Sequence, residues 1–215
     1  MTTSLPPGHL SRLCAALTAV VACLALGLQF RLLHATLAGG QASLAEVIWR
    51  FLGFFTLLTN MLVAWAAIRI AAALPVSARS RFIVVCGIVF VGVVYSVALR
   101  STWQPQGWQA VADHGLHDAT PLLFALTWLA LPHGTLGWRD VAAAACWPLG
   151  YCFYALLRGG WDGWYAYWFL DPDRMGVSAL AVSIVLLVAG FLMLGGVLMW
   201  VDRLLAPASR SRTAE

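Results

Sequence analysis

Six apolar runs follow one another along the chain, separated by short segments that contain Gly, Pro and charged residues. The runs cover residues 10–30, 47–68, 81–99, 110–131, 141–157 and 177–201. A helix needs about 20 residues to cross the hydrocarbon core of a bilayer, and each run is near that length. The pattern therefore predicts an all-α, polytopic integral membrane protein with six transmembrane helices in one bundle.

The limits of the membrane domain follow from the first and fourth runs. The fourth run begins near Ala110, because a start after His117 would leave fewer than about 17 residues before Pro132. The first run is longer than the roughly 7–15 residues of a secretory signal core, so we interpret it as the first helix. We expect one transmembrane domain over residues 1–206 and a polar cytoplasmic tail over residues 207–215.

The composition supports this class of protein and argues against a nucleic-acid partner. Hydrophobic residues make up 61% of the chain and charged residues 10%, whereas a soluble domain carries about 25% charged residues. The net charge of +4 is explained by Arg residues beside anionic lipid headgroups. Membrane lipids, and not nucleic acids, are therefore the expected partners.

The Arg residues also indicate how the chain is oriented. Cytoplasmic loops of membrane proteins carry the excess of basic residues. If both termini are cytoplasmic, the inside segments hold the larger group (Arg12, Arg69, Arg79, Arg81, Arg139, Arg203, Arg210 and Arg212) and the outside segments the smaller one (Arg31, Arg50, Arg100, Arg158 and Arg174). We therefore expect a multi-pass protein of the cell (inner) membrane with both termini in the cytoplasm.

Small and hydrogen-bonding residues recur at helical spacing on the second predicted helix. Thr59 flanks this stripe, which consists of Gly53, Thr56, Asn60, Val63 and Ala67. Such residues commonly do no more than hydrogen-bond to backbone carbonyls and neighbouring helices. The alternative is a working site, because polar groups inside lipid-spanning helices lose solvation and are often functional.

The fourth predicted helix carries a second polar group within or just under the membrane interface, formed by Asp113, His114, His117 and Asp118. Pro121 shares a face with His117, and its missing N–H opens the backbone one turn below the imidazole. At about 1.5 Å per residue, Thr56 lies roughly 13 Å below the outer surface and His117 roughly 10 Å. Two inward-facing side chains at these depths could meet.

The segment 158–172, between the fifth and sixth helices, is rich in aromatic residues. Trp and Tyr concentrate at membrane interfaces, which explains most of these side chains. The glycines at 159, 160 and 163 and the Asp171-Pro172 turn are not explained in that way. They predict that this aromatic-rich outer loop folds as a lid over the outer mouth of the bundle.

Several of these segments together resemble a known family. FTLLTN at 55–60, LHDATPLL at 116–123, WPLGY at 147–151, RG at 158–159 and GWYAYWFLD at 163–171 are similar to the bacterial Pr-six-Pr membrane proteins. Those proteins resemble the androgen-induced-gene and androgen-dependent TFPI-regulating protein family of six-span proteins. The match covers all six helices in order. The chain departs from the bacterial pattern at Ala166, where that family usually has proline between two tyrosines.

The resemblance implies an intramembrane hydrolase for fatty acid esters of hydroxy fatty acids or similar lipid esters, without a cofactor. Thr56 and His117 take the positions of the threonine nucleophile and the histidine base, with Thr59 as a rival nucleophile. His117 would take the proton of Thr56, whose oxygen attacks the ester carbonyl, and a water activated by the same imidazole would hydrolyse the acyl-threonine. Asp113, one turn from His117, is a better orienting group than Asp118. The amide of Asn60 could stabilise the oxyanion.

Two other hypotheses remain open at this stage. The DHxxHD segment, Asp113 to Asp118, could bind zinc or haem with His34 as a further ligand, although no cysteine and no second HxxH lie near it. Alternatively, the bundle could bind a lipid or sterol, or transport a small apolar solute, without catalysis. Gly92, Ser96, Pro148 and the Gly195-Gly196 pair allow the close or bent packing that such a module needs.

Overall fold

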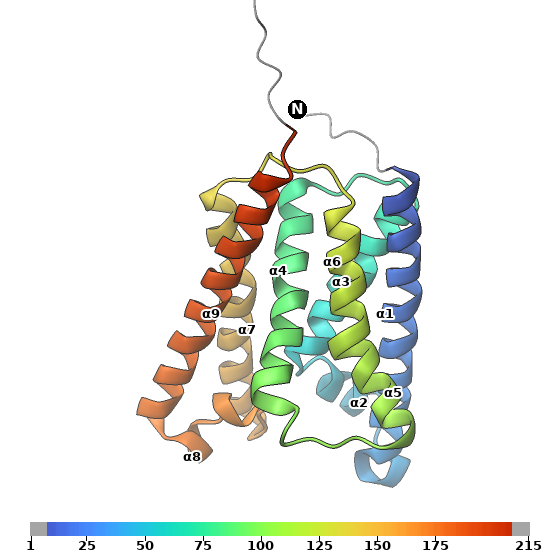
Figure 1. Ribbon diagram of the computed structural model, residues 1–215. Coiled ribbons are helices and arrows are strands. Elements are labelled where there is room, and N and C mark those ends of the chain that lie inside the picture. Colours follow the sequence, from blue (N-terminus) through green and yellow to red (C-terminus); the bar gives the residue numbers. More distant parts are fainter. Residues whose placement is uncertain (1–7, 208–215) are drawn as a thin grey trace, which may run out of the picture.

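Long helices run alternately up and down through the molecule, and shorter ones join them at one end (Figure 1). The computed structural model describes residues 8–207. Within this range the α-helices are α1 (His9–Thr36), α2 (Leu44–Phe51), α3 (Phe55–Ala71), α4 (Ala78–Val94), α5 (Gly107–His114), α6 (Thr120–Leu129), α7 (Trp138–Asp162), α8 (Pro172–Met175) and α9 (Val177–Leu204). Two 3₁₀ turns (η1, Leu37–Gly40; η4, Trp168–Leu170) and two π-helical turns (η2, Tyr95–Leu99; η3, Gly115–Ala119) complete the described fold. The all-helical prediction is confirmed.

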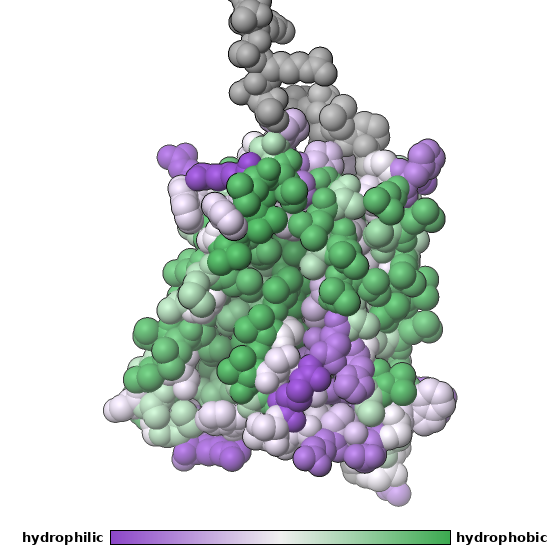
Figure 2. Space-filling model, viewed as in Figure 1, coloured by the Kyte–Doolittle hydropathy of each residue, from purple (hydrophilic) through white to green (hydrophobic). Residues whose placement is uncertain are grey.

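The long helices indicate a multi-pass membrane protein. Among the described residues, four helical stretches are long and apolar enough to cross a membrane, namely His9–Thr36, Ala78–Leu99, Trp138–Asp162 and Val177–Leu204. A fifth is added if the bent pair α2 and α3 is counted as one span. The structure thus accounts for four or five of the six predicted crossings, and the stretch from α5 to α6 is not among them. A hydrophobic belt covers the middle of the visible face (Figure 2).

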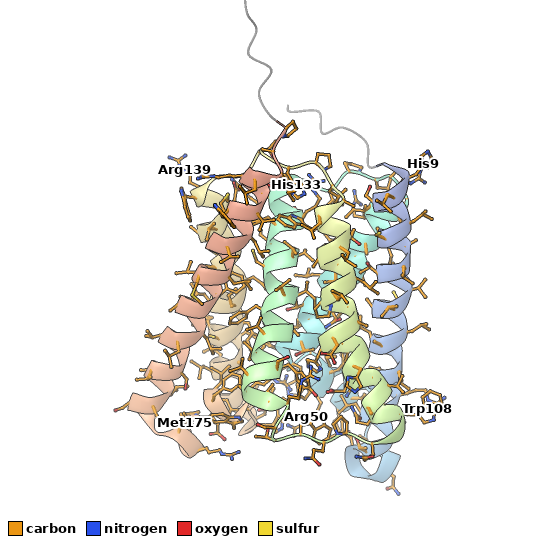
Figure 3. The ribbon with its side chains drawn as sticks, in the orientation of Figure 1. His9, Arg50, Trp108, His133, Arg139 and Met175 are labelled. Carbon is orange, nitrogen blue, oxygen red and sulfur yellow. The ribbon has the colours of Figure 1, made fainter. Side chains whose placement is uncertain are left out.

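Both ends of the described chain lie at the same end of the bundle (Figure 1). His9, His133 and Arg139 mark that end, whereas Arg50 and Trp108 lie near the opposite one (Figure 3). The opposite end also contains α2, α5 and α8. The predicted cytoplasmic tail, 207–215, falls outside the described residues except for Pro207.

The second predicted helix is broken, which corrects the sequence interpretation. Helices α2 and α3 meet at an angle of 88° around Leu52, Gly53 and Phe54. Gly53 therefore belongs to the corner and not to the helical stripe that includes Thr56. The break also places Thr56 in the first turn of α3, so the depth estimated from a continuous helix does not apply.

Side chains of α7 stabilise this corner. Tyr151 Oη donates to the Gly53 carbonyl at 2.9 Å, and Tyr154 Oη donates to the Leu52 carbonyl at 3.2 Å. Both carbonyls lose their helical partners at the break, and an unpaired carbonyl in an apolar environment is costly. Gly53 also has no room for a side chain, because a methyl group there would lie 2.2 Å from Arg158 Nη1. The residues around the break do not by themselves predict these contacts with Tyr151, Tyr154 and Arg158.

Two further sequence predictions are corrected, namely the cause of the open backbone near His117 and the C-terminal end of α7. The backbone around His117 is opened by the π-helical turn Gly115–Ala119, and Pro121 follows it in the first turn of α6. Helix α7 continues past residue 157 to Asp162, so Arg158 lies on a helix and not in the outer loop. Gly163 ends α7 with a φ of 68°, a left-handed conformation that favours glycine.

Candidate active site

Thr56 and His117 meet inside the bundle. Thr56 is the second residue of α3 and is 7% exposed, and His117 lies in the π-helical turn between α5 and α6. Thr56 Oγ1 is 3.3 Å from His117 Nε2. This distance lies within the range of nucleophile–base pairs before substrate binds.

Asp113 lies one helical turn before His117 and contacts the other ring nitrogen. His117 Nδ1 is 3.0 Å from the Asp113 carbonyl oxygen and 3.2 Å from Asp113 Oδ1. Both of these atoms are acceptors, so Nδ1 carries a proton. In the neutral ring Nε2 is then the acceptor, and it faces the Thr56 hydroxyl. Thr56, His117 and Asp113 thus form a chain of polar contacts in which the imidazole lies between the hydroxyl and the carboxylate.

Tyr95 contacts both the histidine and the aspartate. Its ring stacks on the His117 ring, with centroids 4.0 Å apart and planes inclined by 16°. Its hydroxyl donates to Asp113 Oδ2. Tyr95 begins the π-helical turn η2, and such turns occur frequently at functional sites. Gly92 permits α4 to lie close to the turn that carries His117, because a methyl group at Gly92 would lie only 3.2 Å from the His117 carbonyl oxygen.

Tyr167 reaches Thr56 from the outer loop. Thr56 N–H donates to Tyr167 Oη at 3.2 Å, and Tyr167 Oη is also 3.2 Å from Thr56 Oγ1. The N–H groups of a helix's first turn have no partner within the helix, so the phenol acts as a cap for α3. Burial raises the pKa of Tyr167, although its contacts with Thr56 act in the opposite direction. The phenol therefore stays neutral and can donate its proton to an oxygen at Thr56.

The two remaining predicted polar residues of α3 are bound to their surroundings. Asn60 is fully buried, and its Nδ2 donates to the carbonyls of Thr56 at 2.8 Å and Leu116 at 3.2 Å. Its amide hydrogens thus join α3 to the turn that carries His117. Thr59 accepts a hydrogen bond from Trp147 Nε1 at 3.1 Å. Thr59 is therefore engaged with α7 rather than with the imidazole.

A cavity of about 520 Å³ opens beside the site. Thr56, Asp113, His117, Tyr95 and Tyr167 all contribute to its lining. The rest of the wall comes from Gln29, Leu33, Thr36, Phe54, Leu57, Leu99, Trp103, Gln109, Leu116 and Ala166. Its size is typical of a small-molecule site, and its lining combines apolar side chains with a few polar groups.

The DHxxHD segment is divided between two sets of partners. Asp113 contacts His117, whereas Asp118 Oδ2 lies 2.7 Å from His114 Nδ1 and Asp118 also pairs with Arg100. Across residues 8–207, no three His, Cys, Asp or Glu side chains come together as metal ligands would. The described geometry gives the alternative hypothesis of a zinc or haem site no support.

A cationic and aromatic cluster joins the outer loop to the α2–α3 corner. The Arg158 guanidinium is buried, 4.3 Å from the Trp49 ring centroid and 5.1 Å from the Trp164 centroid. Arg50 lies 4.3 Å from the Trp164 centroid. Arg158 Nε is 3.5 Å from Asp162 Oδ2, at ion-pair distance but without a hydrogen bond. These contacts hold Trp164 of the outer loop against α2 and α7.

Sequence reasoning predicted Thr56, His117, Asn60 and Asp113, and the fold brings all four together. It did not identify Tyr95 as a site residue, and it treated Tyr167 only as part of the aromatic loop. Tyr95 stands alone in an apolar run, which gives no local signal. No family model, curated protein or solved structure matches the chain.

Proposed function

We propose that this protein is an intramembrane lipid-ester hydrolase with Thr56 as nucleophile and His117 as base. The observation that carries the proposal is the Thr56 Oγ1–His117 Nε2 contact of 3.3 Å at the wall of a 520 Å³ cavity. Acyl-transfer enzymes repeatedly use a nucleophile that contacts a base, which in turn contacts an orienting carboxylate.

The mechanism begins with proton transfer from Thr56 Oγ1 to His117 Nε2. Thr56 Oγ1 forms a bond to the ester carbonyl carbon, and the imidazolium returns its proton to the alcohol oxygen as the carbon–oxygen bond breaks. A water molecule then loses a proton to Nε2 and attacks the acyl-threonine, and the imidazolium returns this proton to Thr56 Oγ1 as the bond from Oγ1 to the acyl carbon breaks and the acid is released. Asp113 Oδ1, 3.2 Å from Nδ1, stabilises the positive ring that forms in both steps.

Tyr167 supplies the donor for the developing oxyanion in this proposal. Its neutral hydroxyl lies 3.2 Å from Thr56 Oγ1, next to the place where the carbonyl oxygen would gain charge. Thr56 also lies in the first turn of α3, and the N-terminal end of a helix carries partial positive charge. We therefore assign Asn60 to holding α3 against Leu116 rather than to the oxyanion, because its amide already donates to two carbonyls.

The proposed substrates are fatty acid esters of hydroxy fatty acids or similar lipid esters, as in the six-span family that the sequence resembles. The mostly apolar cavity and the hydrophobic surface of the visible face (Figure 2) support a lipid substrate. We further propose six crossings in the inner membrane with cytoplasmic termini. This topology is supported by the position of both described chain ends at one end of the bundle and by the Arg distribution.

The test is hydrolysis of a hydroxy-fatty-acid ester by purified protein in detergent. Thr56→Ala and His117→Ala should each abolish turnover without loss of folding, and Thr56→Ser should retain part of it because it keeps the hydroxyl. The double variant should be no worse than either single one, since the two residues act as a unit. Thr59→Ala is the matched control, because Thr59 bonds to Trp147 instead of His117.

Wild-type turnover by Thr56→Ala would show that the nucleophile is misassigned. If wild type hydrolyses no lipid ester but retains a bound lipid through purification, the non-catalytic lipid-binding hypothesis is favoured instead.

A further inference from the structure

Two cavities meet at Thr56, and they differ in size and chemistry. The larger one, described above, holds about 520 Å³, and the second holds about 40 Å³. Thr56, Tyr95, Leu99 and Tyr167 line both. An ester carbonyl at Thr56 would therefore have one cavity on each side.

The smaller cavity is a narrow apolar slot between α4, α7, α9 and the outer loop. Its wall includes Phe90, Val91 and Val94 of α4, Pro148 of α7 and Leu187 of α9. Val94 and Leu187 are only partly buried. The slot thus suits an unbranched hydrocarbon chain and offers little to a polar group.

The larger cavity has a different character. His117 and Asp113 line this cavity and not the slot. Gln109 Nε2 donates to Gln29 Oε1 at 2.9 Å on its wall, so polar groups are available away from Thr56. A substrate part with hydroxyl or carboxyl groups is therefore better accommodated here.

The position of His117 decides which half of an ester enters which cavity. The imidazolium must return its proton to the alcohol oxygen, so that oxygen lies on the His117 side of Thr56. The acyl chain then extends to the other side. The water that completes the reaction needs the same imidazole, and it can enter the large cavity after the alcohol has left.

We propose that the narrow slot is the acyl subsite and the large cavity the alcohol subsite. This inference rests on the proposed hydrolase function and adds substrate orientation to it. The enzyme should select closely for the length and width of the acyl chain, because the slot holds about 40 Å³ and the large cavity about 520 Å³. It should tolerate a bulky alcohol part. The acyl-threonine keeps its chain in the slot while water attacks from the side of His117.

The test uses two ester series with purified wild type and variants. One series has a fixed alcohol and acyl chains from acetyl to palmitoyl, and the other has an acetyl group and alcohols of increasing bulk. Leu187→Phe narrows the slot, and Leu186→Phe is its control because Leu186 is exposed on the same helix. Leu33→Phe narrows the large cavity, with exposed Leu24→Phe as its control.

Leu187→Phe should lower kcat/KM for long acyl chains on the order of tenfold or more, with little effect on acetyl esters. Leu187→Ala should raise kcat/KM for long acyl chains, and this variant keeps the test decisive if the larger phenylalanine disturbs folding. Leu33→Phe should reduce turnover only of bulky alcohols. The opposite assignment, with Leu187 variants altering the alcohol series, would overturn the orientation while leaving the hydrolase proposal intact. Absence of turnover of every ester by wild type would overturn both.

Discussion

Gly53→Ala tests whether the corner between α2 and α3 depends on close packing of Arg158 and Trp164. The added methyl group would lie 2.2 Å from Arg158 Nη1 and 2.6 Å from Trp164 Cζ3. A side-chain carbon does not come this close to a heavy atom to which it is not bonded, so a neighbour must move. Arg158 is 5% exposed and stacks against Trp49 and Trp164, which leaves its guanidinium little freedom to move.

The size of the effect follows from overpacking a buried site, which costs about 1–3 kcal/mol. For a chain of this length, each kcal/mol lowers the melting temperature by roughly 2–4 °C. We therefore expect Gly53→Ala to melt on the order of 2–12 °C below wild type. Activity should fall as well, because Gly53 lies three residues before Thr56 and its carbonyl is held by Tyr151.

The assay is thermal unfolding of the purified protein in detergent, followed by tryptophan fluorescence, with ester hydrolysis measured in parallel. Gly150→Ala is the matched control, since a methyl group at this position of α7 would meet nothing within 4 Å. An alanine there should melt at or above the wild-type temperature because it is the better helix former. Equal melting temperatures for Gly53→Ala and Gly150→Ala would refute the proposed packing of the corner.

Three further predictions concern the site and the topology. Asp113→Asn should lower kcat on the order of a hundredfold, because the backbone carbonyl of residue 113 still accepts from His117 Nδ1 and keeps the tautomer. This loss is smaller than the roughly 10⁴-fold loss seen when the aspartate of a catalytic triad is replaced and the histidine takes the wrong tautomer. A loss as large as that of His117→Ala would contradict this reasoning. Tyr167→Phe should lower kcat by about 10²–10³ with little change in KM if the phenol stabilises the oxyanion, whereas Tyr165→Phe should change neither. A reporter fused after Glu215 should be active only if it functions in the cytoplasm, and a periplasmic signal would rule out the proposed six-span topology.

The sequence by itself determined the class of protein and the helical segments. Hydropathy depends only on local composition, so the apolar runs predicted the four long helical stretches that include α1, α4, α7 and α9, but not the breaks in the second and fourth runs. It also identified Thr56, His117 and Asp113 as a possible set, because polar groups within such runs are few. The i, i+4 spacing of Asp113 and His117 further predicted their contact, since residues at that separation share one face of a helix.

Only the tertiary structure decided how these residues are used. Thr56 is 61 residues from His117 and 111 from Tyr167 along the chain, and local periodicity carries no information on contacts at such separations. The break at Gly53 likewise depends on Arg158 and on Tyr151, both on a distant helix. A continuous apolar run is predicted as one helix unless the side chains that donate hydrogen bonds to its freed carbonyls and pack at its corner are known. For the same reason, the stacking of Tyr95 on His117 became visible only when α4 and the π-helical turn were packed together.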